Sequence, residues 1–306
     1  MPNLHDIDKR IKSISSTKQI TRTMEMVAGA KVKHATERIY AATPYSESMT
    51  EMLQGVAERV QASENPLLEK RENVKRILAV AVVSDRGLAG GFNSNVLRSV
   101  EKTIRAKKAQ GVEVEVIACG KKAIGFFKYR KINPVLEFAD LSADPTFEEA
   151  KQIADYAVKA YEEGSVDEVV LVYNHAKNAA EQVLREEIIL PVDTQAVMAA
   201  AAGSSLDAAD AADQSADTVS ASLEFEPEPA DVLQRLLPAY LRTSIYHALI
   251  DSAAGEQAAR RTAMHSATEN ANEIVETLSR LYNRVRQGAI TTEINEIVGG
   301  AAALED

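Results

Sequence analysis

The sequence predicts an α/β protein in which a mostly parallel, helix-covered sheet lies between two long terminal helices. At the N-terminus, apolar residues step by three, four and three positions at Leu4, Ile7, Ile11 and Ile14. This spacing is that of an amphipathic helix, and it returns in the last third of the chain. The middle of the chain instead alternates short apolar runs with amphipathic stretches, which is typical of a parallel sheet with crossover helices.

The first part of the chain, residues 1–73, is predicted to be a long helix followed by its connection to the sheet. Helical spacing extends from residue 3 to about residue 60. A proline ring clashes with the preceding helical turn and the residue lacks an amide donor, so we expect a break at Thr43-Pro44.

The central part, residues 74–193, is predicted to be the α/β domain. Buried strands are expected over residues 76–84, 112–118, 134–138, 168–173 and 182–190. Helices are expected over residues 95–109, 121–129 and 146–163, with Gly111 and Gly164 ending the first and the last of them. Right-handed crossovers are the default for such an alternation.

Residues 194–222 form a segment of different character. Eleven acidic residues and no basic residue lie between Glu186 and Gln234, and bulky apolar residues are scarce. Such a composition does not bury enough surface to offset the entropy of ordering, so a flexible acidic insertion is expected.

The final part, residues 223–306, is predicted to be one very long helix. Pro238 is expected either to bend this helix or to mark its start, and Gly299-Gly300 are expected to end it. At about 1.5 Å per residue it would extend roughly 90–100 Å, so its apolar stripe needs the N-terminal helix or a partner as cover. The stripe comprises Leu241, Ile245, Ala248, Ala271, Ile274, Leu278, Leu281, Val285 and Ala289.

Composition excludes several classes of protein. The single cysteine, Cys119, excludes an internal disulfide, and the longest strongly apolar run, residues 77–83, is too short to span a bilayer. Acidic residues interrupt the N-terminus, which argues against a signal or transit peptide. Basic residues are not interleaved with aromatic residues, so nucleic-acid binding is not expected.

Candidate chemical sites have simpler structural interpretations. Residues 84–93 (SDRGLAGGFN) follow a strand and precede a helix, but they lack the spacing of a phosphate-binding loop. A tight turn with Asn93 or Ser94 capping the helix is therefore favoured, and an Asp85–Arg86 ion pair there would be structural. The five histidines show no metal-ligand spacing, so no metal and no cofactor are expected, and Cys119 is interpreted as a buried core thiol.

Two features of the long helices suggest docking. One of Met24 and Met26 is expected to pack in a helix–helix seam while the other faces solvent. Arginines recur along the C-terminal helix, either as a solvated face or as a surface for acidic partners: Arg260, Arg261, Arg280, Arg284 and Arg286. The end of that helix carries apolar residues without an evident cover, which indicates a docking site: Ile290, Ile294, Ile297, Val298, Ala301, Ala302 and Leu304.

Five stretches of the chain resemble the γ subunit of F-type ATP synthases. They are residues 19–28 (QITRTMEMVA), 84–95 (SDRGLAGGFNSN), 256–264 (EQAARRTAM), 267–272 (ATENAN) and 282–294 (YNRVRQGAITTEI). The similarity covers nearly the whole chain except residues 194–222. It implies an antiparallel, left-handed coiled coil of the two terminal helices, with a Rossmann-like domain between them.

The resemblance further implies a non-catalytic rotor that couples ion-driven rotation of a membrane c-ring to ATP synthesis in a hexamer of α and β subunits. Its partners would be those subunits, the ε subunit and the c-ring, at the cytoplasmic face of the cell membrane and without a membrane span of its own. Contacts with the hexamer are implied for Met24, Arg260, Gln287, Thr291, Ile294, Ile297 and Val298. Contacts of the foot with ε and the c-ring are implied for Leu223, Phe225 and Glu226.

The acidic insertion lies where chloroplast relatives carry a redox-regulated cysteine pair, but here it lacks cysteine, which excludes thiol switching at that place. A charge-based brake on rotation is one hypothesis for it. Two other interpretations of the whole chain are a nucleotide-binding enzyme that uses the glycine-rich turn, and a static coiled-coil adaptor.

Overall fold

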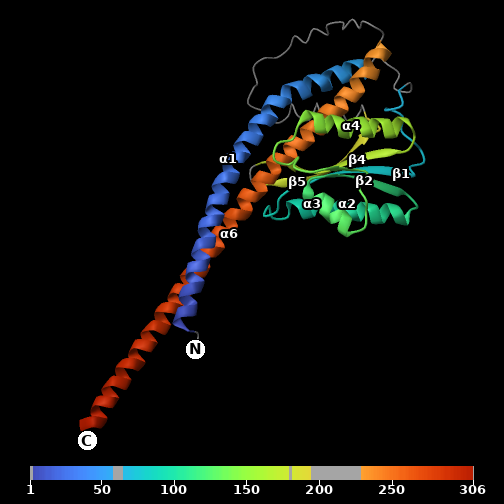
Figure 1. The fold of residues 1–306 in the computed structure, drawn as a ribbon. Helices are drawn as coiled ribbons and strands as arrows, with labels where there is room; N and C mark the ends of the chain where they lie inside the picture. The colour runs from blue at the N-terminus through green and yellow to red at the C-terminus, as the bar shows by residue number, and fades with distance from the viewer. Residues whose placement is uncertain (1–2, 58–64, 179–180, 194–228, 306) are drawn as a thin grey trace. The chain divides into compact units, whose positions relative to one another are not determined.

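The computed structural model describes residues 3–57, 65–178, 181–193 and 229–305 (Figure 1). The chain forms two compact units, and each is described by itself. One unit contains residues 1–30 and 260–306, and the other contains residues 31–259. Helices α1 (Leu4–Ala57) and α6 (Pro229–Glu305) contribute to both. The acidic segment 194–222 and the foot residues that the resemblance implies, Leu223, Phe225 and Glu226, lie outside the described residues.

The larger unit is built on a five-stranded sheet in the order β3-β2-β1-β4-β5. Its strands are β1 (Arg76–Val82), β2 (Glu113–Cys119), β3 (Leu136–Phe138), β4 (Glu168–Ala176) and β5 (Gln182–Leu190). All neighbouring strands are parallel except β4 and β5, which pair antiparallel. The predicted α/β class with a mostly parallel sheet is therefore confirmed.

Helices cover both faces of this sheet, with α2 (Phe92–Ala109) and α3 (Lys121–Tyr129) on one face and α4 (Phe147–Glu162) on the other (Figure 1). The period-2 alternation of β1 divides its side chains between them. Leu78 and Val80 belong to the core that includes α4, and Ala79 and Ala81 belong to the core under α2 and α3. The α4 core also receives apolar residues of α1 and α6, such as Leu53 and Leu241.

The strand order reverses direction beside β1. The chain leaves β1 through α2 toward β2 and β3, and then returns through α4 to β4 on the other side of β1. This reversal between β1 and β4 is the topological switch point of a doubly wound fold, where such folds usually bind ligands beyond the carboxyl ends of their strands.

Three expected helix boundaries are wrong. Helix α1 continues through Pro44, because buried or half-buried residues recur every three or four positions on both sides of it, at Ala42, Ser46, Met49 and Leu53. The stabilisation gained by packing along this stripe exceeds the cost of the backbone hydrogen bond that proline removes. Helix α6 begins at Pro229, so Pro238 does not mark its start. Pro238 lies inside the helix for the same reason as Pro44, since Leu233, Leu237 and Leu241 are buried.

Gly299-Gly300 also fail to end α6, which extends to Glu305. A glycine in a helix costs only about 1 kcal/mol relative to alanine, and the residues that follow this pair are three alanines, the best helix formers.

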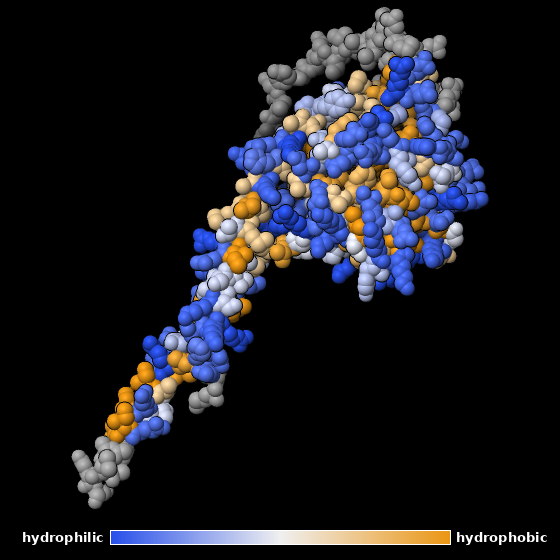
Figure 2. Space-filling model, viewed as in Figure 1, coloured by the Kyte–Doolittle hydropathy of each residue, from blue (hydrophilic) through white to orange (hydrophobic). Residues whose placement is uncertain are grey.

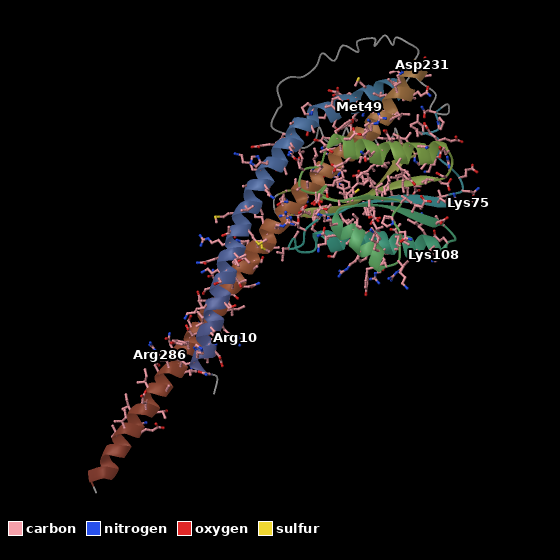
Figure 3. All side chains as sticks on the ribbon, viewed as in Figure 1. Arg10, Met49, Lys75, Lys108, Asp231 and Arg286 are labelled. Atoms are coloured by element: carbon pink, nitrogen blue, oxygen red, sulfur yellow. The ribbon has the colours of Figure 1, made fainter. Side chains whose placement is uncertain are left out.

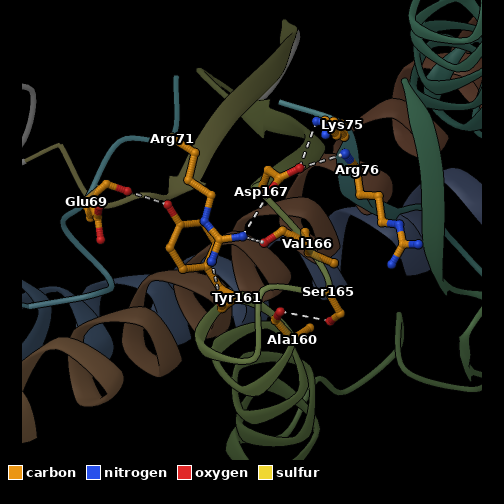
Figure 4. A network of polar contacts seen from close by, with 9 residues as sticks. All are labelled: Glu69, Arg71, Lys75, Arg76, Ala160, Tyr161, Ser165, Val166 and Asp167. Atoms are coloured by element: carbon orange, nitrogen blue, oxygen red, sulfur yellow. Dashed lines mark hydrogen bonds and ion pairs between the residues drawn. The ribbon is translucent and has the colours of Figure 1, made fainter. Parts of the chain in front are cut away.

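The connection that precedes β1 is fastened to the turn between α4 and β4 by Arg71 (Figure 4). Its guanidinium donates hydrogen bonds to the carbonyl oxygens of Tyr161 and Val166 at 2.5 and 3.0 Å, and to Oδ1 of Asp167 at 2.8 Å. The other oxygen of Asp167 accepts the amides of Lys75 and Arg76 at 2.7 and 2.9 Å. One carboxylate therefore ties together the connection and the starts of β1 and β4.

This arrangement gives the stability of the domain a dependence on pH. Burial alone would raise the pKa of Asp167, but the hydrogen bonds from Arg71 and from the two amides hold that pKa below its usual value. The stabilisation is complete above the unfolded-state pKa of about 3.9 and is lost as the pH falls through the lower folded-state pKa.

We predict that Asp167→Asn lowers the free energy of unfolding at neutral pH by about 2 kcal/mol, because Arg71 loses its charged acceptor. The difference between parent and variant shrinks as the pH falls below about 4. Urea titrations of the full chain at several pH values measure it, with the exposed Glu163→Gln as control. A difference that stays constant with pH would contradict this role of Asp167.

Candidate functional site

The smaller unit pairs the first turns of α1 with the later turns of α6 through a regular seam. Buried or half-buried residues alternate in steps of three and four along each helix. On α1 they are Leu4, Ile7, Ile11, Ile14, Lys18, Thr21, Glu25 and Ala28, and on α6 they are Met264, Thr268, Ala271, Val275, Leu278, Tyr282 and Val285. A sustained repeat of 3.5 residues is the signature of a left-handed coiled coil.

Contacts across the seam fix its direction and register. The hydroxyl oxygens of Thr21 and Thr268 lie 2.8 Å apart, and Glu25 Oε1 lies 3.0 Å from His265 Nδ1. One turn further along α1, a Cβ on Gly29 would lie 3.8 Å from the side chain of Arg261. Because the partner number on α6 falls as the number on α1 rises, the helices are antiparallel, as the resemblance implied.

One layer of the seam is polar. Thr21 and Thr268 are each 9% exposed, and each hydroxyl also contacts its own helix, at the carbonyl oxygens of Lys18 and Met264 respectively. Each hydroxyl keeps its bond within its own helix in any register, but the contact between the two hydroxyls forms only when the threonines face each other. Leucines, in contrast, can slide past one another at small cost, so the threonine pair favours this register.

Helix α6 extends beyond the cover that α1 provides. In this register the beginning of α1 lies near residue 286 of α6, and Figure 3 places Arg10 and Arg286 along the same stretch of the pair. Every residue of α6 from Arg286 to Val298 is exposed. Figure 2 shows hydrophobic surface on this part of the helix. Ile290, Ile294, Ile297 and Val298 are 48, 53, 66 and 61% exposed.

The apolar residues at this end do not continue the seam. Extended in steps of four and three, the seam would pass through Ala289, Thr292 and Glu296, which cannot form an apolar stripe. Ile290, Ile294 and Ile297 instead form a separate stripe with the same spacing on an adjacent face. We call these three residues and Val298 the apolar end. Its displacement from the seam indicates a surface for something other than α1.

The structure places the remaining predicted contact residues as follows. Gln287 and Thr291 are exposed on the same uncovered length of α6, one turn apart. Met24 is half-buried beside the seam while Met26 is 63% exposed, although the seam position itself belongs to Glu25.

The arginines of α6 differ in exposure. Arg260 is only 8% exposed, whereas the others are exposed: Arg261, Arg280, Arg284 and Arg286. Ile274, which we expected in the apolar stripe, is 47% exposed, because Val275 takes the seam position.

The glycine-rich turn, residues 84–93, is filled by its own side chains. Asn93 Oδ1 accepts the amide and the hydroxyl of Ser84, both at 2.9 Å, and Asn93 Nδ2 donates to the Arg86 carbonyl. The expected caps are therefore wrong: α2 begins after Gly91, and Asn93 braces the turn instead of the helix end. Ser94 donates back to the carbonyl of Gly91.

Asp85 is held by the neighbouring loops. Its carboxylate accepts the amides of Lys121 and Asp140, both at 2.9 Å, and the amide and hydroxyl of Ser142. Burial alone would raise its pKa, but these four donors hold the pKa below its usual value. The group acts as a brace between three loops at the carboxyl edge of the sheet, in place of the local ion pair with Arg86 that we expected.

The other candidate sites are consistent with structural roles. Cys119 ends β2 and is fully buried, as expected, and burial raises the pKa of its thiol. Within the described ranges, the His, Cys, Asp and Glu side chains form no group of three that could hold a metal ion. Among the helices that the structure describes, none has an apolar stretch long enough to cross a membrane.

We predict that Thr21→Val and Thr268→Val each lower the free energy of unfolding of the helix pair by about 1 kcal/mol, because the hydrogen bond between the two hydroxyls is lost. The double variant should recover most of this loss, since two valines form a matched apolar contact. Thermal unfolding of the full chain followed by circular dichroism gives the coupling energy. Additive single effects would show that the two hydroxyls do not interact.

Comparisons with known proteins agree with this geometry. A family model described as ATP synthase matches residues 3–304. The chain is 40% identical to the ATP synthase gamma chain of Chlorobaculum tepidum, with both chains covered completely, and 38% identical to that of Leptospira biflexa, with 99% of this chain and 100% of the relative covered.

Solved structures agree as well. A chain of the central stalk and c-ring of Tetrahymena thermophila mitochondrial ATP synthase is 26% identical with a TM-score of 0.57, over 81% of this chain and 99% of that one. A chain of the Euglena gracilis mitochondrial ATP synthase shares the fold with a TM-score of 0.65 at 19% identity, over 98% of this chain and 94% of that one. The full-length matches show that the chain belongs to the ATP synthase gamma chain family.

Proposed function

We propose that this chain is the rotor of an ATP synthase, turning inside a ring of α and β subunits as ions pass through the membrane c-ring. The observation that carries the proposal is the uncovered length of α6, with its apolar end displaced from the seam. Gamma chains are non-catalytic subunits of the central stalk, so the role of the chain is to couple events at other subunits. Each rotation angle would stabilise particular conformations of the ring through differences in contact energy.

The proposed contacts with the ring are the seven residues implied by the resemblance. Ile294, Ile297 and Val298 would turn within an apolar collar, and Gln287 and Thr291 would meet the loops above it. Met24 and the exposed arginines of α6 would face an acidic lever on the catalytic subunits. The opposite charges of the arginines and the lever would guide the two surfaces together, but in a hydrated interface such ion pairs are too weak to hold the rotor in one position. Arg260 is the least accessible of the seven, so we propose that it contributes through only the exposed part of its side chain.

At the other end, we propose that Leu223, Phe225 and Glu226 contribute to a foot that meets the ε subunit and the c-ring. With such a foot, the chain would lie peripherally at the cytoplasmic face of the cell membrane. For the acidic segment 194–222 we propose a charge-based restraint on rotation in one direction.

The direct test is observation of rotation in single molecules. The complex of this chain with its α and β subunits is fixed to a surface, and a bead is attached through Lys108→Cys, an exposed position on α2 (Figure 3). Because Cys119 is buried, labelling is expected to be selective. We expect stepwise rotation in one direction when ATP is added. A complex that hydrolyses ATP while the bead stays still would favour the static adaptor.

A further inference from the structure

Helix α6 occupies the place where a doubly wound fold usually binds its ligand. The crevice of such a fold lies beyond the carboxyl ends of the strands at the switch point, here between β1 and β4. In this chain the crevice is closed by Gly255 and the small residues around it. All twelve residues from Ala248 to Ala259 are buried, so this length of α6 has no solvated face.

Gly255 allows the backbone of α6 to lie directly against the sheet. A Cβ atom at this position would lie 3.3 Å from the carbonyl oxygen of Asn174, at the end of β4, and 3.4 Å from the ring of Phe92, at the start of α2. It would also lie 3.6 Å from the side chain of Gln182, at the start of β5. The close approach explains why a glycine is used inside a long helix, where it costs about 1 kcal/mol relative to alanine.

One turn earlier, Asp251 joins α6 to the end of β4. Its side chain is only 4% exposed, and its Oδ2 lies 2.6 Å from Nδ1 of His175. Its Oδ1 accepts the amide of Ala176 at 3.0 Å. A buried carboxylate depends on such partners, because without them it would lose the hydration it has in water.

The glycine-rich turn, residues 84–93, also packs against α6. Ala89 of the turn, Phe92 and Ala259 of α6 form a separate buried apolar cluster. Nδ2 of the Asn174 side chain donates to the backbone carbonyl of Phe92 at 2.7 Å and so connects the turn to β4. The apolar side of the turn therefore packs against α6. Loops between a strand and a helix at this position bind a phosphate in other proteins.

We propose that this contact transmits torque between the sheet domain and α6. We call it the crevice joint; it consists of Asp251 and Gly255 on one side and His175, Ala176, Asn174 and Phe92 on the other. The inference rests on the proposed rotary function. If α6 turned about its own axis relative to the sheet, Gly255 would move away from the strand ends and any larger residue in its place would clash. The same turn would break both contacts of Asp251, so the joint resists torsion.

The test measures torsional stiffness in the assembled complex. With the α and β ring fixed and the bead on Lys108→Cys, the angular spread of the bead is recorded while the rotor pauses for ATP. We expect Asp251→Ala to widen this spread, because the sheet domain gains freedom relative to α6. Asp251→Asn should restore much of the stiffness, since its amide oxygen can still accept the Ala176 amide.

A matched control is Asp155→Ala, which removes another ion pair between the sheet domain and α6. Asp155 on α4 lies 2.7 Å from Arg242, but the pair is on the surface, with side chains 43 and 33% exposed. We expect this control to leave the angular spread at the parent value. His175→Ala, which keeps the amide contact of Asp251, should widen the spread less than Asp251→Ala, and it replaces that variant if the complex fails to assemble.

The outcomes separate the two proposals. If the parent bead rotates and neither Asp251→Ala nor His175→Ala widens the spread, the crevice joint does not carry torque, although the chain is a rotor. An equal widening with Asp155→Ala would also overturn the inference, because the effect would then belong to any contact with α6. If the parent bead does not rotate, the rotary function itself fails.

Discussion

The antiparallel seam between α1 and α6 is the constraint on which the rest of the account depends. Its repeat of 3.5 residues supplies the left-handed pairing, and its buried threonine pair selects one register. That register determines which residues of α6 extend past the start of α1 and are left exposed. The apolar end exists as a surface only because the seam stops where it does. Two helices of unequal length therefore produce both a stable pair and an uncovered end.

The larger unit shows how a nucleotide-binding architecture can be put to another use. Its mostly parallel sheet and its switch point match the arrangement that binds a cofactor in other proteins, although its glycine-rich turn lacks the spacing of a phosphate-binding loop. Here Asn93 fills the turn, Asp85 braces the neighbouring loops, and α6 closes the crevice. The fold alone would have suggested an enzyme, whereas the occupancy of its crevice by the chain's own helix favours a mechanical role.

Much of the architecture could be predicted from the sequence, because it depends on local periodicity. The predicted bounds of α3 and β5 coincide with those observed, and Thr146 caps α4 through a capping box with Glu149, directly before the helix begins. Local signals failed where packing opposed them, as at Pro44 and Pro238, and also at Gly299-Gly300, where the alanines that follow favour the helix. The crevice joint could not be predicted, since Asp251 and His175 are 76 residues apart and meet only through the fold. A glycine among small residues in mid-helix, Gly255, was the one available signal.

The central claim is that the paired segments of α1 and α6 act as one body. A disulfide between Thr21→Cys and Thr268→Cys, whose parent hydroxyl oxygens lie 2.8 Å apart, tests it within the assembled ATP synthase. The account predicts that oxidation leaves ATP hydrolysis and rotation unchanged relative to the reduced form of the same variant. Loss of hydrolysis on oxidation, with recovery on reduction, would show that the two helices must move past each other and would contradict the account.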